Sequence, residues 1–157
     1  MSDGNAKEAT QALLAVLPLL NRIVAAEVRK EAGEDTTMPQ FRVLSHLAEE
    51  PVTLSVLARK RRVSLQSMGE LVQVLVERGW VARTPDPHDR RQSLLHLTEH
   101  GRAHHERAQA AMMQRLVPLL AQLRDEELSA ILMALPALHR ALIQSEEIEH
   151  GNPKATS

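Results

Sequence analysis

Residues 86–98 of this 157-residue chain read DPHDRRQSLLHLT, and the rest of the sequence is best interpreted outward from this stretch. Its first half combines aspartate and proline, which are typical of turns, with a following pair of arginines, Arg90 and Arg91. Its second half, 93–97, alternates in polarity and predicts a strand with Leu95 and Leu97 on one face. The extended segment 80–84 would be the partner strand. We therefore predict a two-stranded β-hairpin with two arginines at its tip.

Three helices are predicted just before the hairpin. A capping box begins at Thr37, Thr53 can cap a short helix over 54–61, and Ser64 can cap a longer one over 64–78 that ends at Gly79. Only two residues separate the last two helices, which is the spacing of a helix-turn-helix. Their predicted buried residues lie at helical spacing: Phe41, Leu44, Leu47, Met68, Leu71, Val72 and Leu75.

Longer helices are predicted at both ends of the chain. A capping box at Asn5 opens a helix that ends at Gly33, and two later helices are capped by Thr98 and Asp125. A polar, flexible tail is expected over 148–157. Prolines predict kinks or breaks within the long helices, at Pro18, Pro118 and Pro136.

Composition limits the function classes. The chain has no cysteine, which excludes disulfides and thiol-based redox switching within it. The longest apolar runs are shorter than the roughly 18 residues of a membrane span. The first residues do not have the pattern of a signal peptide. We therefore expect a cytoplasmic protein without a membrane partner.

Charge is unevenly distributed. The formal net charge is -1, but residues 59–91 carry eight basic side chains against four acidic ones. A basic region on an otherwise acidic protein is the electrostatic pattern expected for a polyanion-binding site.

The predicted elements suggest how double-stranded DNA would be bound. A helix over 64–78 fits the major groove, where the Gln66 amide can pair with adenine. A hairpin arginine can enter the minor groove, and Asp89 could orient one arginine through a bidentate pair. The predicted DNA-contacting residues are Arg61, Arg62, Ser64, Gln66, Ser67, Gln73, Asp89, Arg90 and Arg91.

Residues 86–101 resemble the wing of the MarR family of transcription regulators. The family pattern is Asp-x-Arg, two variable residues, two aliphatic residues, a variable residue and Leu-Thr. Every fixed place is filled here, by Asp89, Arg91, Leu94, Leu95, Leu97 and Thr98. Residues 75–81, LVERGWV, also resemble the segment of the family in which the second helix of the helix-turn-helix ends, here the predicted helix over 64–78. The order of elements matches the family over about residues 8–147.

The resemblance implies a mainly α fold with a small β-hairpin wing (α+β) in a single domain over 1–157. It further implies a winged helix-turn-helix lobe over 37–97 and a helical dimerisation region over 8–32 and 99–147. Arg91 would be the minor-groove arginine, braced by Asp89. Such homodimers commonly repress genes from pseudo-palindromic operators, and many release DNA on binding a small anionic or phenolic effector.

This chain departs from the family pattern at two places. Gly69 and Glu70 stand where a hydroxyl residue followed by a basic one is common, and Arg61 stands where an aliphatic residue is usual. Both departures concern the DNA contacts rather than the fold.

Other interpretations remain open at this point. His100 and His104 are four residues apart, with His96 and His105 nearby, so a zinc-responsive regulator is an alternative. A helical protein–protein interaction module that never binds DNA is another. Ordinary surface histidines are the simpler explanation, and we predict no metal, cofactor or enzymatic activity. Three polar residues could face an effector cleft: Asn21, Arg22 and His46.

Overall fold

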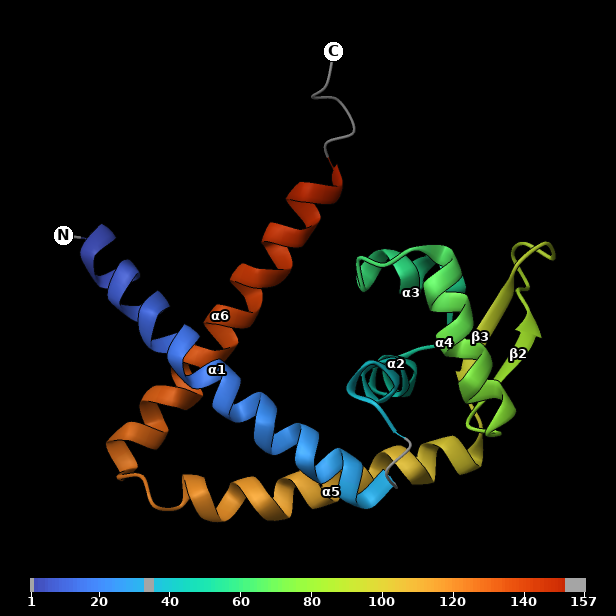
Figure 1. The fold of residues 1–157 in the computed structure, drawn as a ribbon. Helices are drawn as coiled ribbons and strands as arrows, with labels where there is room; N and C mark the ends of the chain where they lie inside the picture. Colours follow the sequence, from blue (N-terminus) through green and yellow to red (C-terminus); the bar gives the residue numbers. More distant parts are fainter. Residues whose placement is uncertain (1, 33–35, 152–157) are drawn as a thin grey trace. The chain divides into compact units, whose positions relative to one another are not determined.

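A computed structural model describes residues 2–32 and 36–151 (Figure 1). The chain divides into two compact units, 1–115 and 116–157, and α5 crosses the boundary. The first unit holds the other elements except α6. The elements in chain order are α1 (Ser2–Ala32), α2 (Met38–Glu49), β1 (Val52–Thr53), α3 (Leu54–Lys60), α4 (Leu65–Glu77), β2 (Val81–Pro85), β3 (Ser93–Leu97), α5 (Glu99–Leu120) and α6 (Asp125–Gly151).

The helix starts in the first unit follow from local hydrogen bonding. Thr37 forms the predicted capping box with Gln40 at the start of α2. The Thr53 hydroxyl accepts the N–H of Val56, and the Ser64 hydroxyl accepts that of Ser67. Each cap satisfies a backbone donor that the first helical turn leaves unpaired. The predicted starts of α2, α3 and α4 are therefore confirmed.

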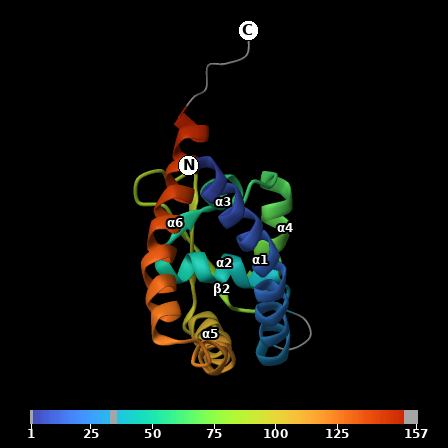
Figure 2. The same ribbon diagram turned by 90° about the vertical axis from the view of Figure 1, so that its left-hand side faces the viewer.

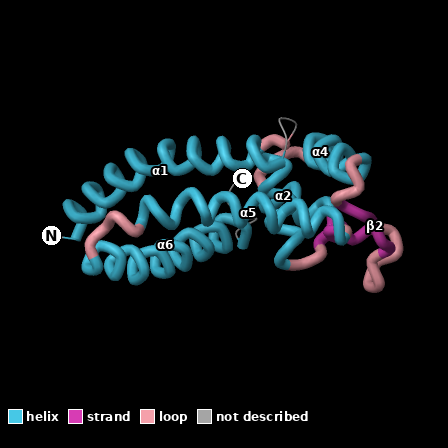
Figure 3. Tube along the Cα trace, turned by 90° about the horizontal axis from the view of Figure 1, so that it is seen from below, coloured by secondary structure: helices cyan, strands magenta, loops and turns pink. Residues whose placement is uncertain are grey.

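The sheet is larger than the predicted hairpin. It has three antiparallel strands in the order β1-β3-β2, with Val52 opposite Leu95 and Val81 opposite Leu97. The prediction of two strands was wrong because β1 has only two residues, one of which is also the N-cap of α3. A two-residue strand is too short to produce a visible alternation. The loop between β2 and β3, the wing loop, lies at one end of the sheet (Figure 3).

The core of the first unit joins the sheet to α2, α3 and α4. Leu44, Leu57, Val72 and Leu75 are fully buried, and Leu95 is 1% exposed. Leu95 and Leu97 both belong to this cluster, so their predicted inward face is confirmed. Leu71 is only partly buried, while the other predicted core residues of α2 and α4 are buried. Two views agree that α2 lies between α3 and the α5 segment of the first unit (Figures 1 and 2).

Consecutive histidines of α5 dock on the two aromatic residues of the chain. His104 stacks on Trp80 with ring centroids 3.9 Å apart, and His105 stacks on Phe41 at 5.3 Å. Val28 of α1 and Ala108 of α5 bury Phe41 further. We call these two stacks the histidine joint. Burial lowers the pKa of both histidines, and nearby Arg107 and His100 lower that of His104 further.

Thr98 holds the start of α5 by hydrogen bonds to the backbone that follows α4. The Thr98 hydroxyl donates to the carbonyl of Gly79 at 2.6 Å and accepts the N–H of Gly101 at 2.9 Å. The N–H of Thr98 donates to the carbonyl of Trp80 at 3.0 Å. Thr98 thus acts as the predicted cap of α5 and also fixes the exit of the sheet.

Several predicted boundaries differ from the structure. Helix α1 begins at Ser2 rather than at a cap on Asn5, and it runs through Pro18 without a break. Helices α5 and α6 also continue through their prolines, because one proline removes only one donor from a long hydrogen-bonded ladder. Asp125 is the first residue of α6 rather than its predicted cap, and the Glu127 carboxylate accepts the N–H of Arg124 at 2.9 Å just before the helix. It extends to Gly151, inside the predicted tail; residues 33–35 and 152–157 lie outside the described residues.

Two helices carry large exposed apolar surfaces. Segments Gly4–Lys30 and Asp125–Ser145 are long and apolar enough to cross a membrane by length and composition alone. The uninterrupted apolar runs within these helices are short, as expected, but the isolated polar residues between them leave the mean hydropathy of each helix high. The side chains include Leu14 at 60% exposure on α1 and Met133 at 78% on α6. Such surfaces on a folded chain mark interaction sites.

Candidate nucleic-acid interface

The turn of the helix-turn-helix is a Schellman motif. The N–H of Arg62 donates to the carbonyl of Arg59 at 3.1 Å, and that of Val63 donates to Ala58, also at 3.1 Å. The motif requires a left-handed residue, and Arg62 has φ 51°. Gly79, with φ 71°, occupies the same place at the end of α4. Arg62 therefore adopts a left-handed backbone conformation that is usually occupied by glycine, at a cost of about 1–2 kcal/mol.

Two serines at the start of α4 are bonded to each other. The Ser64 hydroxyl accepts the N–H of Ser67 at 3.0 Å and donates to the Ser67 hydroxyl at 2.9 Å. The single hydroxyl hydrogen of Ser64 is thereby used, whereas that of Ser67 remains available. Both side chains are exposed at a helix N-terminus, where the backbone favours anions. Of the two, Ser67 is the better donor for a phosphate.

Two carboxylates on the exposed face of α4 accept hydrogen bonds from glutamine side chains of the same helix. Gln66 Nε2 donates to Glu70 Oε1 at 3.2 Å, and Gln73 Nε2 donates to Glu77 Oε1 at 3.1 Å. Pairing with adenine uses both the amide N–H and the amide oxygen. Glu70 therefore competes with a base for the donor of Gln66. The oxygen of Gln73 is also engaged, since it accepts from Arg83 Nη2 of β2 at 3.4 Å.

Two aspartates shape the wing loop. Asp86 Oδ1 accepts the N–H of His88 at 2.8 Å, and Asp89 Oδ1 accepts that of Arg91 at 3.0 Å. Asp89 Oδ2 accepts from the side chain of Gln92 at 3.1 Å. These two contacts lower the pKa of Asp89, the Gln92 contact most, so the carboxylate stays ionised well below neutral pH. Two backbone bonds between Asp86, Asp89 and Gln92 close the loop.

Asp89 contacts the backbone of Arg91 and not, as predicted, an arginine side chain. A bidentate pair between Asp89 and an arginine side chain was predicted, but in the described residues Asp89 holds the backbone of Arg91 instead. The side chains of Arg90 and Arg91 are both exposed. The loop conformation is therefore fixed while the two guanidinium groups remain available to a partner.

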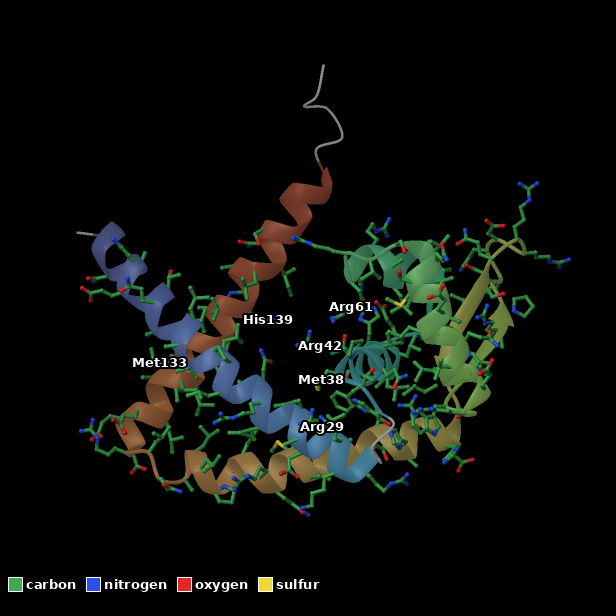
Figure 4. The ribbon with its side chains drawn as sticks, in the orientation of Figure 1. Arg29, Met38, Arg42, Arg61, Met133 and His139 are labelled. Carbon is green, nitrogen blue, oxygen red and sulfur yellow. The ribbon has the colours of Figure 1, made fainter. Side chains whose placement is uncertain are left out.

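Arg61 lies apart from the other predicted contacts. It caps the end of α3, and Figure 4 shows it beside Arg42 of α2, on the side away from the wing in that view. Partial burial, and to a lesser extent the charge of Arg42, lowers the pKa of Arg61. The structure thus groups Ser64, Gln66, Ser67 and Gln73 on α4, and Asp89, Arg90 and Arg91 in the wing loop, with Arg62 between the two helices.

The histidines of α5 were candidates for a metal site. No group of three metal-ligating side chains occurs in the described part of the chain. His104 and His105 are turned into the histidine joint, which sequence reasoning missed because it assigned them to the surface. Of the effector-cleft candidates, Asn21 and Arg22 are exposed on α1. His46 Nε2 instead contacts Lys60 Nζ at 3.2 Å.

Comparison with known proteins agrees with this geometry. A family model described as MarR family matches residues 34–92. An uncharacterised HTH-type transcriptional regulator of Mycobacterium bovis is 31% identical over 128 residues, covering 81% of this chain and 87% of the relative.

Solved structures extend the similarity to most of the chain. The crystal structure of RV1404 from Mycobacterium tuberculosis has a TM-score of 0.76 at 28% identity and covers 96% of this chain and 97% of that one. A mutant MarR from E. coli, solved with operator DNA, has a TM-score of 0.60 at 26% identity and covers 81% and 93%. With its winged helix DNA-binding fold, the chain belongs to the MarR family of transcription regulators.

Proposed function

We propose that this protein is a sequence-specific double-stranded DNA-binding repressor that acts as a homodimer on a pseudo-palindromic operator. The observation that carries the proposal is the wing loop. Asp89 fixes its backbone and leaves two exposed arginines next to a helix-turn-helix. The operator-bound structural relative supports the same use of the fold.

The two grooves would be contacted by different elements. Helix α4 enters the major groove, where Gln66 and Gln73 face the bases and Ser67 donates to a phosphate. Arg91 enters the minor groove and Arg90 contacts a phosphate. The left-handed Arg62 supports a role in binding, because strain of this kind is commonly retained where the side chain has a function.

A second copy of the chain would cover the exposed apolar surfaces of α1 and α6. Such cover explains two membrane-length helices in a cytoplasmic DNA-binding protein. Effector-controlled release of DNA is part of the proposal, since the family resemblance implies it. A two-fold dimer predicts half-sites about one helical turn apart.

Arginine substitutions in the wing test this function. Duplex DNA from upstream of the coding sequence is titrated with the wild type, Arg90→Ala and Arg91→Ala at several salt concentrations. We expect Arg91→Ala to weaken specific binding by about 1–3 kcal/mol, which is about 5-fold to 150-fold in Kd, so that operator binding is lost at the concentrations at which the wild type binds. Arg90→Ala should weaken binding to all sequences equally and reduce the salt slope by about one.

Sedimentation and thermal melting serve as controls, because both variants should remain dimeric and folded. Unchanged binding by Arg91→Ala would refute the minor-groove assignment. A protein that binds no upstream DNA at any salt concentration would favour the protein-interaction alternative. DNA binding that requires added zinc would favour the metal-responsive one.

A further inference from the structure

Two pairs, each of a glutamine and a glutamate, follow one another along the exposed face of α4. Gln66 Nε2 donates to Glu70 Oε1 at 3.2 Å, and Gln73 Nε2 donates to Glu77 Oε1 at 3.1 Å. A carboxylate only accepts hydrogen bonds, so in each pair the amide nitrogen must point toward the glutamate and the amide oxygen away from it. The orientation of both amides is therefore fixed by their partners.

The two pairs differ in the atoms that they leave free. Gln73 Oε1 accepts from Arg83 Nη2 of β2 at 3.4 Å, so the second pair is closed and ties α4 to the sheet. Among the described residues, Gln66 Oε1 and Glu70 Oε2 accept no hydrogen bond. The first pair also lies in the N-terminal half of α4, the part of a recognition helix that contacts base edges. It is therefore the pair with free atoms at the place where a base would be read.

The free oxygen of Glu70 can only accept a hydrogen bond. In the major groove, the N4 amino group of cytosine and the N6 amino group of adenine are donors, whereas guanine and thymine present acceptors. Adenine also presents the acceptor N7, which needs a donor that a glutamine has and a glutamate lacks. Opposite guanine or thymine, the carboxylate would lose its water and gain no hydrogen bond in return. Cytosine is thus the base that best fits Glu70.

We propose that Glu70 is a specificity-determining residue, whose Oε2 accepts a hydrogen bond from the N4 amino group of a cytosine in the major groove. Gln66 positions the carboxylate by holding Oε1, so less side-chain freedom is lost on binding. The negative charge is unfavourable against the other bases, and specificity is a difference between affinities, so this penalty strengthens the preference. The role of Glu70 rests on the proposed DNA-binding function and deepens it by naming a base that α4 reads.

Selection from a library of randomised duplex DNA tests this role without a known operator. The full-length wild type, Glu70→Ala, Glu70→Gln and Glu77→Gln each select duplexes, and the bound fraction is sequenced. We expect the wild type to prefer cytosine at one position of each half-site, by about 5-fold to 150-fold in Kd over guanine or thymine, the usual effect of one mismatched base pair. Glu70→Ala should lose the preference at this position and keep it elsewhere.

Glu70→Gln distinguishes base reading from a structural role. It keeps the length of the side chain and adds an amide donor, so the preferred base should change from cytosine to adenine, whose N6 and N7 pair with a glutamine amide. Glu77→Gln is the matched control, because it removes the equivalent carboxylate of the closed pair at the last residue of α4. It should leave the selected sequence unchanged.

One change to the DNA tests the amino group itself. In the selected site the cytosine is replaced by 2-pyrimidinone, which lacks the N4 amino group. The Kd of the wild type should rise about as much as Glu70→Ala raises it on the unmodified site. The Kd of Glu70→Ala should be nearly the same for both duplexes, because the two changes remove the same hydrogen bond.

The outcomes separate the role of Glu70 from the proposed function. The role is overturned if Glu70→Ala, shown by thermal melting to be folded, selects the same sequence as the wild type. It is also overturned if Glu70→Gln keeps the full cytosine preference, if Glu77→Gln alters the selected sequence as Glu70→Ala does, or if 2-pyrimidinone leaves wild-type affinity unchanged. In each of these cases the sequence-specific function stands. If the wild type binds no DNA, or binds it without enriching any sequence, the proposed function fails and the role of Glu70 fails with it.

Discussion

A methyl group at Gly101 would collide with the backbone at the exit of α4. The Cβ of an alanine there would overlap the carbonyl oxygen of Trp80 and lie 2.7 Å from its carbonyl carbon. That oxygen accepts the N–H of Thr98, and the N–H of Gly101 is bonded to Thr98 Oγ1. Neither backbone can withdraw without breaking the contacts that hold α5. We therefore predict that Gly101→Ala destabilises the protein, although it removes a helical glycine.

The size of this effect comes from two opposing contributions. Replacing a helical glycine by alanine usually stabilises by about 0.5–1 kcal/mol. Overpacking against a fixed neighbour costs about 1–3 kcal/mol, and here the neighbour is backbone. Because backbone cannot move aside as a side chain can, the upper end of that cost applies, and about 3 kcal/mol less about 1 kcal/mol leaves a net loss of about 2 kcal/mol. At this chain length that loss corresponds to about 4–8 °C in the melting temperature.

Gly69→Ala is the matched control. It also replaces a helical glycine, but the added Cβ would meet only Leu54 Cδ2, at an ordinary 3.7 Å. Its melting temperature should rise by about 2–4 °C, from a gain of about 1 kcal/mol. Both variants are compared with the wild type by thermal unfolding at pH 7.5. Equal shifts in the same direction, or a more stable Gly101→Ala, would refute the close-approach argument.

Two further predictions concern charge. The pKa values of His104 and His105 are lowered in the folded state, so the unfolded chain takes up protons first as the pH falls below about 6.5. Stability to urea should therefore be full above pH 6.5 and decline toward pH 5. His104→Phe, which keeps a ring against Trp80, should flatten this decline, and an unaltered pH profile would contradict the assignment. Glu70→Gln removes a negative charge from α4 and frees Gln66 Nε2 from a charged acceptor. It should tighten binding to unrelated DNA severalfold in a fluorescence titration, whereas unchanged or weaker binding would show that Glu70 does not oppose DNA.

Local rules predicted the helix-turn-helix and the wing well. Thr37, Thr53 and Ser64 cap helices because a single side-chain oxygen meets a nearby N–H, and such short-range bonding is visible in the sequence. The strand over 93–97 alternates because one face meets the core and the other does not. The order of the elements was predictable from these caps, and the inward face of Leu95 from the alternation of the strand.

Features that depend on distant packing were not predictable in this way. The buried face of α5 consists largely of glycine, alanine and two histidines, so it lacks the apolar pattern that identifies a core helix. His104 and His105 were read as surface residues because their partners, Trp80 and Phe41, are far away in the sequence. Opposite charge predicts an arginine side chain as the partner of Asp89, but the backbone N–H of Arg91, two residues along the chain, lies within reach of its short carboxylate.

The histidine joint also gives the protein a built-in optical reporter. Trp80 is the only tryptophan and the chain has no tyrosine, so the indole fluorescence of the protein comes from this one side chain. Its ring lies against His104 at 3.9 Å, and the Arg78 guanidinium is 5.0 Å from its centroid. An imidazolium quenches indole emission more strongly than a neutral imidazole does. Emission from the unlabelled protein therefore reports on the protonation of His104 and on the integrity of the contact between α5 and Trp80, in solution and in real time.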